Sequence, residues 1–277
     1  MAVKPTQTRR GHRITPEAAR PLNRVLAEET PVALVYDGST QAVMMATPEA
    51  IEDFAYGFSL TEGIITARDQ IERFEIQSHR VGSEMALEAR FWLREDRRTA
   101  LSARRRFMAG PVGCGLCGID SLDQAQRDLP PLPPDDLILS AEDIASANAA
   151  LRAHQPLHDA THAVHAAGFL MPGKGIVMAR EDVGRHNALD KLIGALWRAG
   201  ISPGAGAIVL TSRLSIELIQ KAVMAGCPAL IALSAPTAAA LRLAERSGLT
   251  LAAYARATGF DVFSHPERIV SEVFNVA

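Results

Sequence analysis

The chain has 277 residues, of which 48% are hydrophobic and 22% are charged, and its formal net charge is −2. This length holds about two domains, and the composition is that of an ordinary globular protein. The small net charge excludes a bulk attraction to nucleic acid or to anionic membranes. No apolar run approaches the roughly 20 residues of a membrane span, so we expect a cytoplasmic protein without a membrane partner. Three cysteines at these spacings do not form a disulfide framework.

Apolar runs separated by turn residues predict the elements of the first half of the chain. Asp37-Gly38-Ser39 is a hairpin turn signal, and Thr47-Pro48-Glu49 is a helix start with threonine as the cap. In chain order we expect a loose, flexible basic arm over 1–24, a hairpin of strands over 32–36 and 41–45, a helix from Thr47 to Gly63, and a second hairpin over 71–78 and 85–93.

The run Gly113-Cys-Gly-Leu-Cys-Gly118 follows Arg104, Arg105 and Arg106. Glycines on both sides of Cys114 and Cys117 predict an exposed loop, and nearby cations lower a cysteine pKa from roughly 8.5. Because the thiolate is the reacting species, the loop is suited to nucleophilic sulfur chemistry. A short helix over 121–127 is expected after it.

A proline-rich segment, Leu129-Pro-Pro-Leu-Pro-Pro-Asp-Asp136, is the clearest break in the sequence. Its four prolines exclude a helix interior or a central strand. We therefore expect an N-terminal α+β domain over 25–128 that ends in the CxxC loop, a linker over 129–137, and a larger α/β domain over 138–277.

The second half alternates between strand and helix patterns, which predicts a largely parallel sheet covered by helices. Ligands bind beyond the carboxyl ends of the strands in such sheets. The expected strands cover 160–168, 175–179, 205–211, 228–233 and 249–254, and the expected helices cover 140–152, 186–198, 215–225 and 237–247.

Polar clusters follow three of these strands. Residues 180–191 form a run rich in charges, residues 211–217 supply hydroxyls suited to a helix N-terminus, and residues 255–259 form a short loop with one arginine. The first two also have a plain structural interpretation, a solvated helix start and ordinary helix capping, and the third rests on a single arginine.

The histidines at 158, 162 and 165 suggest a metal site, which needs three or four converging ligands. On the expected strand His165 faces away from His158 and His162, so we expect no metal. Cys227 precedes Pro228 at the start of an apolar strand and is expected to be buried as a small hydrophobic residue.

The Cys114–Cys117 pair fits three known cysteine motifs poorly. A zinc knuckle needs a second pair of ligands, and a thioredoxin-like site places the motif at a helix start. A zinc deaminase needs His-x-Glu upstream, which the sequence lacks. Sulfur transfer and redox chemistry remain.

With these residues in view, the chain resembles the formate dehydrogenase accessory sulfurtransferase family, FdhD, from about Arg20 to Arg268. The segments that carry the resemblance are Cys114-Gly-Leu-Cys-Gly118, the run Arg180–Lys191 with Leu192-Ile-Gly194, Ser212–Glu217, Ser234-Ala-Pro-Thr237 and Leu249-Thr-Leu251. The sequence departs from the family at Thr161-His-Ala-Val-His165, which lacks paired glycines, and at Arg256-Ala-Thr-Gly259, which has one cation fewer.

The resemblance implies a cytidine-deaminase-like three-layer α/β/α larger domain and a homodimer. It also implies an enzyme that takes persulfide sulfur from a cysteine desulfurase and passes it to the molybdenum cofactor, bis-molybdopterin guanine dinucleotide, for formate dehydrogenase. Cys114 matches the persulfide-bearing cysteine, with Cys117 as its partner. The segment assigned to cofactor binding matches Tyr254, Ala255, Arg256, Ala257, Thr258 and Gly259.

The cofactor carries guanines and pyrophosphates, so arginines and helix N-termini are its expected ligands, and GDP is expected to act as a partial mimic. The candidates are Arg180, Arg185, Arg213, Arg256 and Ser215, with Asp182 or Asp190 for a guanine edge. Two other functions remain open: a non-catalytic chaperone that delivers the finished cofactor, and a dithiol oxidoreductase.

Overall fold

The computed structural model describes residues 3–99, 101 and 129–270. The CxxC loop and the helix expected over 121–127 lie outside the described residues. Within the described part, no helix is long and apolar enough to cross a membrane.

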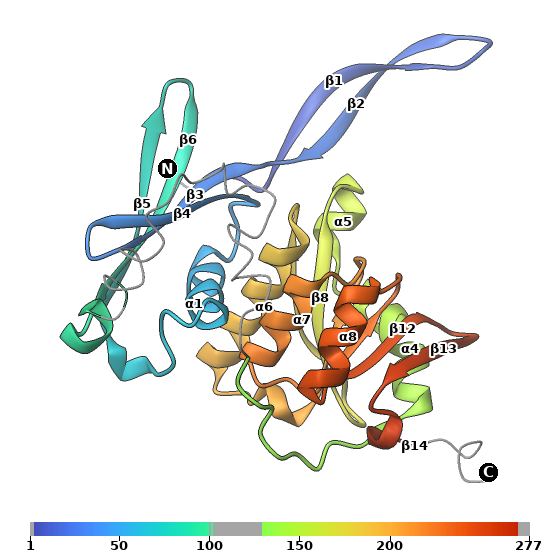
Figure 1. Cartoon of the computed structure of the whole chain (residues 1–277). Coiled ribbons are helices and arrows are strands. Elements are labelled where there is room, and N and C mark those ends of the chain that lie inside the picture. The colour runs from blue at the N-terminus through green and yellow to red at the C-terminus, as the bar shows by residue number, and fades with distance from the viewer. Residues whose placement is uncertain (1–2, 100, 102–128, 271–277) are drawn as a thin grey trace.

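A four-stranded sheet packed against a helix is the main part of the N-terminal body that the structure describes (Figure 1). The strand order is β4 (Ser39–Ala46), β3 (Thr30–Tyr36), β6 (Glu84–Leu93) and β5 (Ile71–Val81), and a short helix, η1 (Arg68–Gln70), precedes β5. The helix is α1 (Ile51–Thr61), whose Phe54 packs with Tyr36 and Phe91 in the core between helix and sheet. Both hairpins expected from the turn signals are therefore confirmed.

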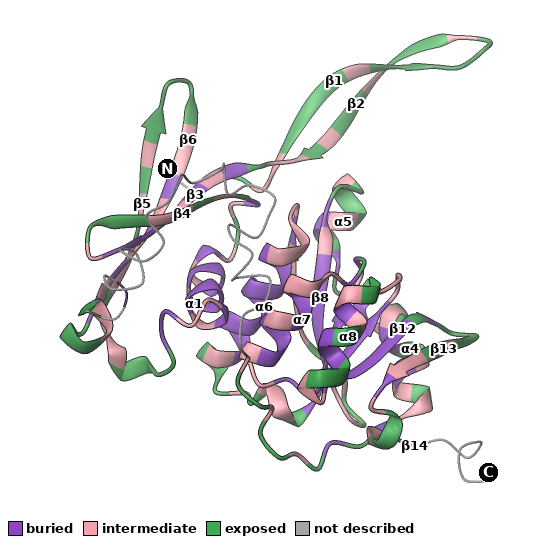
Figure 2. Cartoon of the chain, viewed as in Figure 1, coloured by how far each residue is buried: buried purple, intermediate pink, exposed green. Residues whose placement is uncertain are grey.

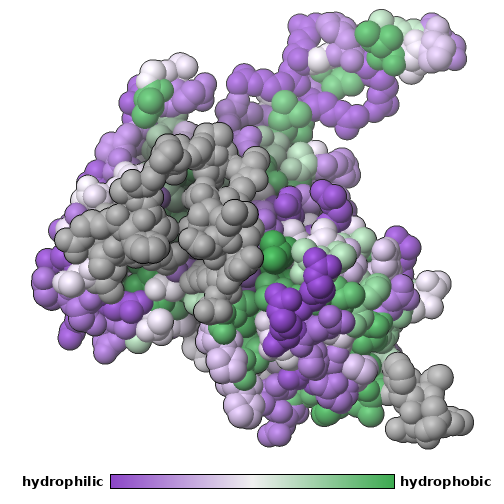
Figure 3. Space-filling model, viewed as in Figure 1, coloured by the Kyte–Doolittle hydropathy of each residue, from purple (hydrophilic) through white to green (hydrophobic). Residues whose placement is uncertain are grey.

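The prediction of a loose arm at the N-terminus is wrong. Two nine-residue strands, β1 (Thr6–Ile14) and β2 (Ala19–Ala27), pair antiparallel along their whole length and project from the body (Figure 1). Thr15 closes the turn between them by accepting a hydrogen bond from the Ala18 amide. The strands bury little, and most of their surface is hydrophilic (Figure 3), so no apolar alternation marked them in the sequence.

The larger body is a six-stranded sheet whose three central strands are parallel to one another. Strand β8 is antiparallel to β10, β9 is antiparallel to β8, and β13 is antiparallel to β12. The order is β13 (Gly259–Ser264), β12 (Thr250–Arg256), β11 (Ala229–Ala232), β10 (Ala207–Leu210), β8 (His165–Met171) and β9 (Gly175–Asp182).

Helices cover both faces of this sheet, and the core lies in two apolar layers (Figure 2). On one face lie α6 (Arg185–Ala199), α7 (Ile216–Met224) and α8 (Ala238–Ser247); on the other lies α4 (Ala141–Arg152). The short elements are α5 (Pro156–Thr161), η2 (Pro203–Ala205), η3 (Pro266–Arg268) and the parallel pair β7 (Leu139–Ser140) and β14 (Ile269–Val270). The mixed α/β class is as expected.

Three boundaries in the second half differ from the sequence expectation. The strand expected from Ala160 begins at His165, because Pro156 starts α5 and His162 ends it with a positive φ of 54°. Strand β9 extends through the first charged residues to Asp182, and β13 was not expected. Residues 129–138 have no helix or strand, as their prolines predict, while the division into domains stays a prediction.

The start of α1 was also predicted wrongly. The helix begins at Ile51, and its cap residue, Ala50, has a φ of 52°. Thr47 contacts the larger body instead: its amide donates to Asp182 Oδ2 at 3.0 Å, and its hydroxyl accepts from the Val183 amide at 3.1 Å. The capping signal in the sequence therefore belongs to a long-range contact.

Helices α1 and α6 cross at two glycines, and this crossing joins the two bodies. A Cβ atom on Gly57 would overlap the Asp190 carbonyl oxygen, and one on Gly194 would overlap the Asp53 carbonyl oxygen. The helix backbones touch directly, so neither position accepts any side chain.

We expect Gly57→Ala and Gly194→Ala each to destabilise the protein by about 1–3 kcal/mol or more, because the added methyl group must push backbone aside. The loss should exceed the gain of about 1 kcal/mol in helix propensity that alanine brings. Urea unfolding measures it, with Gly11→Ala, where the nearest atom is 4.0 Å away, as the control. Equal unfolding midpoints for Gly57→Ala and the control would contradict the crossing.

Candidate functional site

Four strands end at the same edge of the six-stranded sheet. Strand β9 runs parallel to β10, β11 and β12, since β8 between them is antiparallel to both of its neighbours. The polar clusters after β9, β10 and β12 therefore lie along one edge, as expected from the sequence. From β9 to β12 the edge spans four strand spacings, or about 19 Å.

Much of the polar run at 180–191 is structural. Asp182 is fully buried and pairs with Lys191 Nζ at 2.6 Å, while Asn187 donates to Asp182 Oδ1 at 3.1 Å and to the Met45 carbonyl at 2.8 Å. Burial lowers the pKa of Lys191, against the attraction of Asp182. These bonds attach the start of α6 to the segment before α1.

A second buried pair lies beside the helix crossing. Lys221 Nζ donates to Asp190 Oδ2 at 2.8 Å and to Thr61 Oγ1 at 3.0 Å. Burial alone would lower the pKa of Lys221, but the Asp190 and Glu62 carboxylates outweigh it and raise the pKa. Asp182 and Asp190 were both candidates for a guanine edge; both are buried inside ion pairs and offer no free carboxylate there.

Arg180 also points into the structure. Its Nε donates to Asp53 Oδ2 at 2.7 Å, and Arg198 bonds the other oxygen of that carboxylate. Asp53 lies on α1, so Arg180 holds the helix crossing together on its outer side. The neighbouring Glu181 faces the opposite way and accepts from the first amides of α5.

Unpartnered polar atoms gather at the starts of α6 and α7. Arg185 Nε, His186 Nε2, Ser215 Oγ and Glu217 Oε2 are buried, and none has a hydrogen-bond partner among the described residues. His186 Nε2 and Glu217 Oε2 approach to 3.9 Å, which is too long for a hydrogen bond. Buried polar atoms are nearly always bonded in proteins, so such a group indicates a place where a ligand or ordered water completes the bonds.

The electrostatics of this cluster, formed by Arg185, His186, Ser215 and Glu217, favour a neutral imidazole beside a charged carboxylate. Burial, together with the charges of Arg185 and Lys221, lowers the pKa of His186 to about 4. Burial raises the pKa of Glu217, but the Ser215 hydroxyl, a helix amide and the neighbouring cations outweigh it and lower the pKa. Burial also lowers the pKa of His165, at the start of β8.

The N-termini of the two helices lie at the same place, and neither has a side-chain cap. The cap residue of α6 is Gly184, which has no side chain, and the cap residue of α7 is Ser215, whose side chain makes no capping bond. The first N–H groups of a helix carry a partial positive charge and attract anions. With the guanidinium of Arg185 nearby, this end of the edge suits an anionic group.

The turn between β12 and β13 forms the other end of the edge. Tyr254 is 41% exposed and has a φ of 53°, which is uncommon for a residue with a side chain and recurs at functional sites. Arg256, Ala257, Thr258 and Gly259 are exposed, whereas Ala255 is buried and accepts a bond from Asn148. Only part of the segment can thus contact a ligand through side chains.

Two arginines on the edge are free of acidic partners. Arg213, after β10, and Arg256, at the end of β12, are exposed and form no ion pair with any described residue. The edge therefore carries cations at several points along its length, from Arg185 through Arg213 to Arg256.

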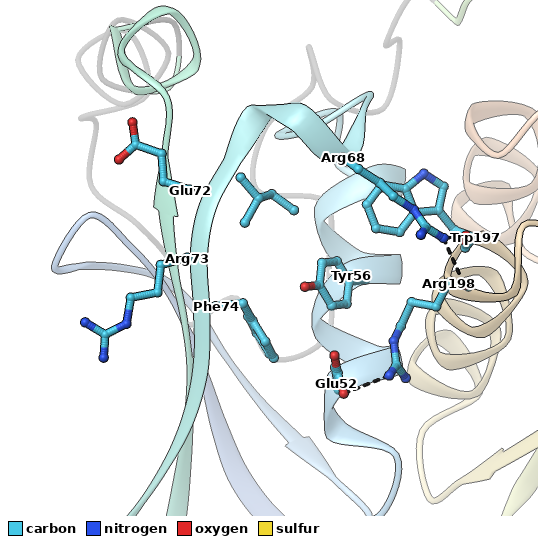
Figure 4. A pocket seen from close by; sticks show the side chains of 9 residues that line it. Glu52, Tyr56, Arg68, Glu72, Arg73, Phe74, Trp197 and Arg198 are labelled. Atoms are coloured by element: carbon cyan, nitrogen blue, oxygen red, sulfur yellow. Dashed lines mark hydrogen bonds and ion pairs between the residues drawn. The ribbon is translucent and has the colours of Figure 1, made fainter.

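A pocket of about 490 Å³ lies at the far end of α6, away from this edge. Tyr56, Phe74 and Trp197 line it, and Arg68 lies over the Trp197 ring at 4.8 Å (Figure 4). No candidate residue from the sequence lines this pocket, and its arginines already have partners: Arg198 bonds Glu52 at 2.9 Å.

No group of possible metal ligands occurs among residues 3–99 and 129–270, and His158 and His162 only contact each other edge to face. Cys227 is fully buried, as expected, and burial raises its pKa to about 11. The sequence did not single out His186 or Glu217; both stood inside quoted motifs, but only folding shows that they meet.

Comparisons with known proteins agree on one family. The model of the FdhD/NarQ family matches residues 27–270. The chain is 50% identical to the sulfur carrier protein FdhD of Agrobacterium fabrum over 89% of this chain and 90% of that protein. It is 53% identical to the sulfur carrier protein FdhD of Brucella abortus over 90% and 91%, respectively.

A solved structure agrees with these sequence matches. The chain resembles the crystal structure of a protein from Desulfotalea psychrophila assigned as a formate dehydrogenase accessory protein. The TM-score is 0.75, the identity is 25%, and the match covers 96% of this chain and 99% of that one.

Protonation of His186 should make stability depend on pH. With a folded pKa of about 4 and an ordinary value of 6.5, the unfolded chain binds more protons between these values. The free energy of unfolding should therefore fall as pH drops from 6.5 to 4, by at most about 3 kcal/mol from this group.

Urea unfolding between these pH values tests this expectation. His186→Gln should flatten the pH profile, whereas His12→Gln, a change on the exposed ribbon, should leave it as in the wild type. Parallel profiles for His186→Gln and the wild type would contradict the assigned pKa.

Proposed function

The chain belongs to the FdhD/NarQ family, and on that premise we propose that it is a sulfur carrier that serves formate dehydrogenase. It takes persulfide sulfur from a cysteine desulfurase and passes it to the molybdenum cofactor. The cofactor is bound as a substrate, bis-molybdopterin guanine dinucleotide. In this function the chain acts as a sulfurtransferase in the cytoplasm, and it works as a homodimer.

The observation that carries the proposal is the set of unpartnered polar groups along the carboxyl edge of the sheet. The cofactor is elongated and carries pyrophosphates at separate points. Half-buried Arg185 and Ser215 at one end, and exposed Arg213 and Arg256 farther along, match this pattern of anionic groups over about 19 Å. The free amides of α6 and α7 add to the attraction.

The turn Tyr254–Gly259 is the second part of the proposed cofactor site. Tyr254 offers an exposed ring, Arg256 a cation, and Ala257, Thr258 and Gly259 open backbone, while Ala255 positions the turn from its buried place. Arg180 supports the site from behind through Asp53. The strand order and directions of the larger sheet support a cytidine-deaminase-like three-layer architecture for this body.

The sulfur chemistry is assigned to Cys114 and Cys117, which lie outside the described residues. The Cys114 thiolate attacks the outer sulfur of the donor persulfide, the sulfur–sulfur bond breaks, and the donor leaves as a thiolate. Attack of the Cys117 thiolate on Cys114 then forms a disulfide and releases hydrosulfide to the cofactor. Each step conserves atoms and electrons.

Persulfide formation separates a sulfur carrier from a pure cofactor chaperone and from a dithiol oxidoreductase. After incubation with cysteine desulfurase and cysteine, mass spectrometry should find one extra sulfur atom on Cys114 of the wild type. Cys114→Ala should lose this mass, whereas Cys227→Ala, a change at a buried thiol, should keep it. Because Cys117 can release the sulfur, Cys117→Ala should retain the added mass on Cys114. Absence of the added sulfur from both the wild type and Cys117→Ala would favour the chaperone, and full labelling of Cys114→Ala would move the role to Cys117.

The cofactor site is tested by calorimetry with GDP as a partial mimic. Arg213→Ala and Arg256→Ala should each weaken GDP binding by roughly 10- to 100-fold, because each removes a charge-assisted hydrogen bond of about 1.5–3 kcal/mol. Arg73→Ala, at the rim of the distant pocket, is the control and should leave affinity unchanged. Unchanged affinity in both edge variants would remove these two arginines from the site.

A further inference from the structure

The ribbon formed by β1 and β2 carries an unusual arrangement of arginines. Its register pairs Arg9 directly with Arg24, and Arg13 directly with Arg20. Side chains of paired residues, and of residues two apart along a strand, point to the same face. All four guanidinium groups therefore belong to one face of the ribbon, in two pairs about 14 Å apart.

This arrangement works against the stability of the ribbon. Like charges directly opposite each other in an antiparallel pair are destabilising. All four arginines are exposed, and none forms an ion pair with any described residue. From Thr6 to Ala27 the ribbon has five arginines against the single acid Glu17. A fold that only needed a hairpin here would not place its cations opposite one another.

The ribbon is placed next to the candidate site. Strand β2 packs against α5, and α5 leads directly into β8, which begins at the carboxyl edge beside the end of β9. In Figure 1 the ribbon extends past α5, above that end of the sheet. A protein held by the ribbon would thus lie close to the edge where the sulfur acceptor is proposed to bind.

The arginine face also includes apolar surface. Leu22 is half-buried between the two arginine pairs, and Leu26 is 47% exposed beyond them. Arginine together with apolar side chains is typical of protein interfaces. Outside the ribbon the chain is net acidic, which disfavours nucleic acid as the partner.

We propose that the arginine face of the β1–β2 ribbon, made of Arg9, Arg13, Arg20 and Arg24 with Leu22 and Leu26, is the docking surface for an acidic patch on the enzyme that receives the cofactor. The ribbon lies beside the edge where the cofactor is proposed to bind, so an enzyme held there is placed to take it. The inference rests on the proposed function, which makes formate dehydrogenase that enzyme. Paired guanidinium groups match carboxylates in bidentate geometry and speed association by steering.

The decisive variant is the double change Arg9→Glu with Arg20→Glu. Each cross-strand pair then joins a glutamate to an arginine, and the face becomes neutral. The ribbon itself should become more stable, so hydrogen exchange of its amides should slow. Partner binding should weaken about tenfold or more at low salt. If the ribbon had only a structural role, a variant that stabilised it would not also weaken partner binding.

Binding of purified formate dehydrogenase is measured on the full chain at about 50 mM and about 200 mM salt, with cysteine desulfurase as a comparison. Binding of formate dehydrogenase by the wild type should weaken at the higher salt, and the double variant should lose most of that dependence. The control is Arg10→Glu, on the opposite face of the ribbon, which should reduce affinity far less.

Several results would overturn the proposal. One is that the wild type does not bind formate dehydrogenase, and another is that the double variant binds it as tightly as the wild type does. A third is that the double variant changes only the binding of cysteine desulfurase, the binding of a DNA duplex or self-association in gel filtration. Persulfuration of Cys114 by inorganic polysulfide distinguishes failure of the docking proposal from failure of the proposed function. Polysulfide should persulfurate Cys114 equally in both proteins if only docking is lost, and in neither if Cys114 is no sulfur carrier.

Discussion

The crossing of α1 over α6 is the constraint on which the candidate site depends. Two glycines let the helix backbones touch. The charged side chains around that contact must then find hydrogen-bond or ion-pair partners without moving the helices apart. The Asp182–Lys191 and Asp190–Lys221 pairs do this in the interior, and Asp53 binds Arg180 and Arg198 on the outer side. Breaking one partner of such a buried pair typically costs about 3–5 kcal/mol, so the position of α6 is strongly determined.

The position of α6 in turn determines what the carboxyl edge can bind. Most polar groups of the segment that enters α6 are paired inside the protein, but Arg185 Nε and His186 Nε2, at its first turn, have no hydrogen-bond partner among the described residues. They face Ser215 and Glu217 from α7, and a fixed helix holds these groups in place before any ligand arrives. Preorganised groups of this kind lose little freedom on binding, which favours affinity for an anionic ligand. The same run of sequence thus serves both packing and recognition.

The sequence predicted most elements because their signals are local. Ser140 caps α4 and Thr237 caps α8. The turns of the two hairpins in the four-stranded sheet each contain a glycine, Gly38 in one and Gly82 in the other. It failed where a local signal had a distant purpose, as at Thr47, which bonds Asp182 across 135 positions. It also failed at the exposed ribbon, where no buried face creates an alternation. The alternation of strands and helices in the sequence was enough to predict that the site lies at this edge. The approach of His186 to Glu217 was not predictable, because it depends on how α6 and α7 are placed relative to each other.

The most direct test of the account is hydrogen–deuterium exchange of the whole chain with and without GDP. If the carboxyl edge is the binding surface, the nucleotide should slow exchange at the first turns of α6 and α7 and at the turn between β12 and β13. The aromatic pocket at the far end of α6 should not change. Protection confined to that pocket, with the edge unaffected, would contradict the account.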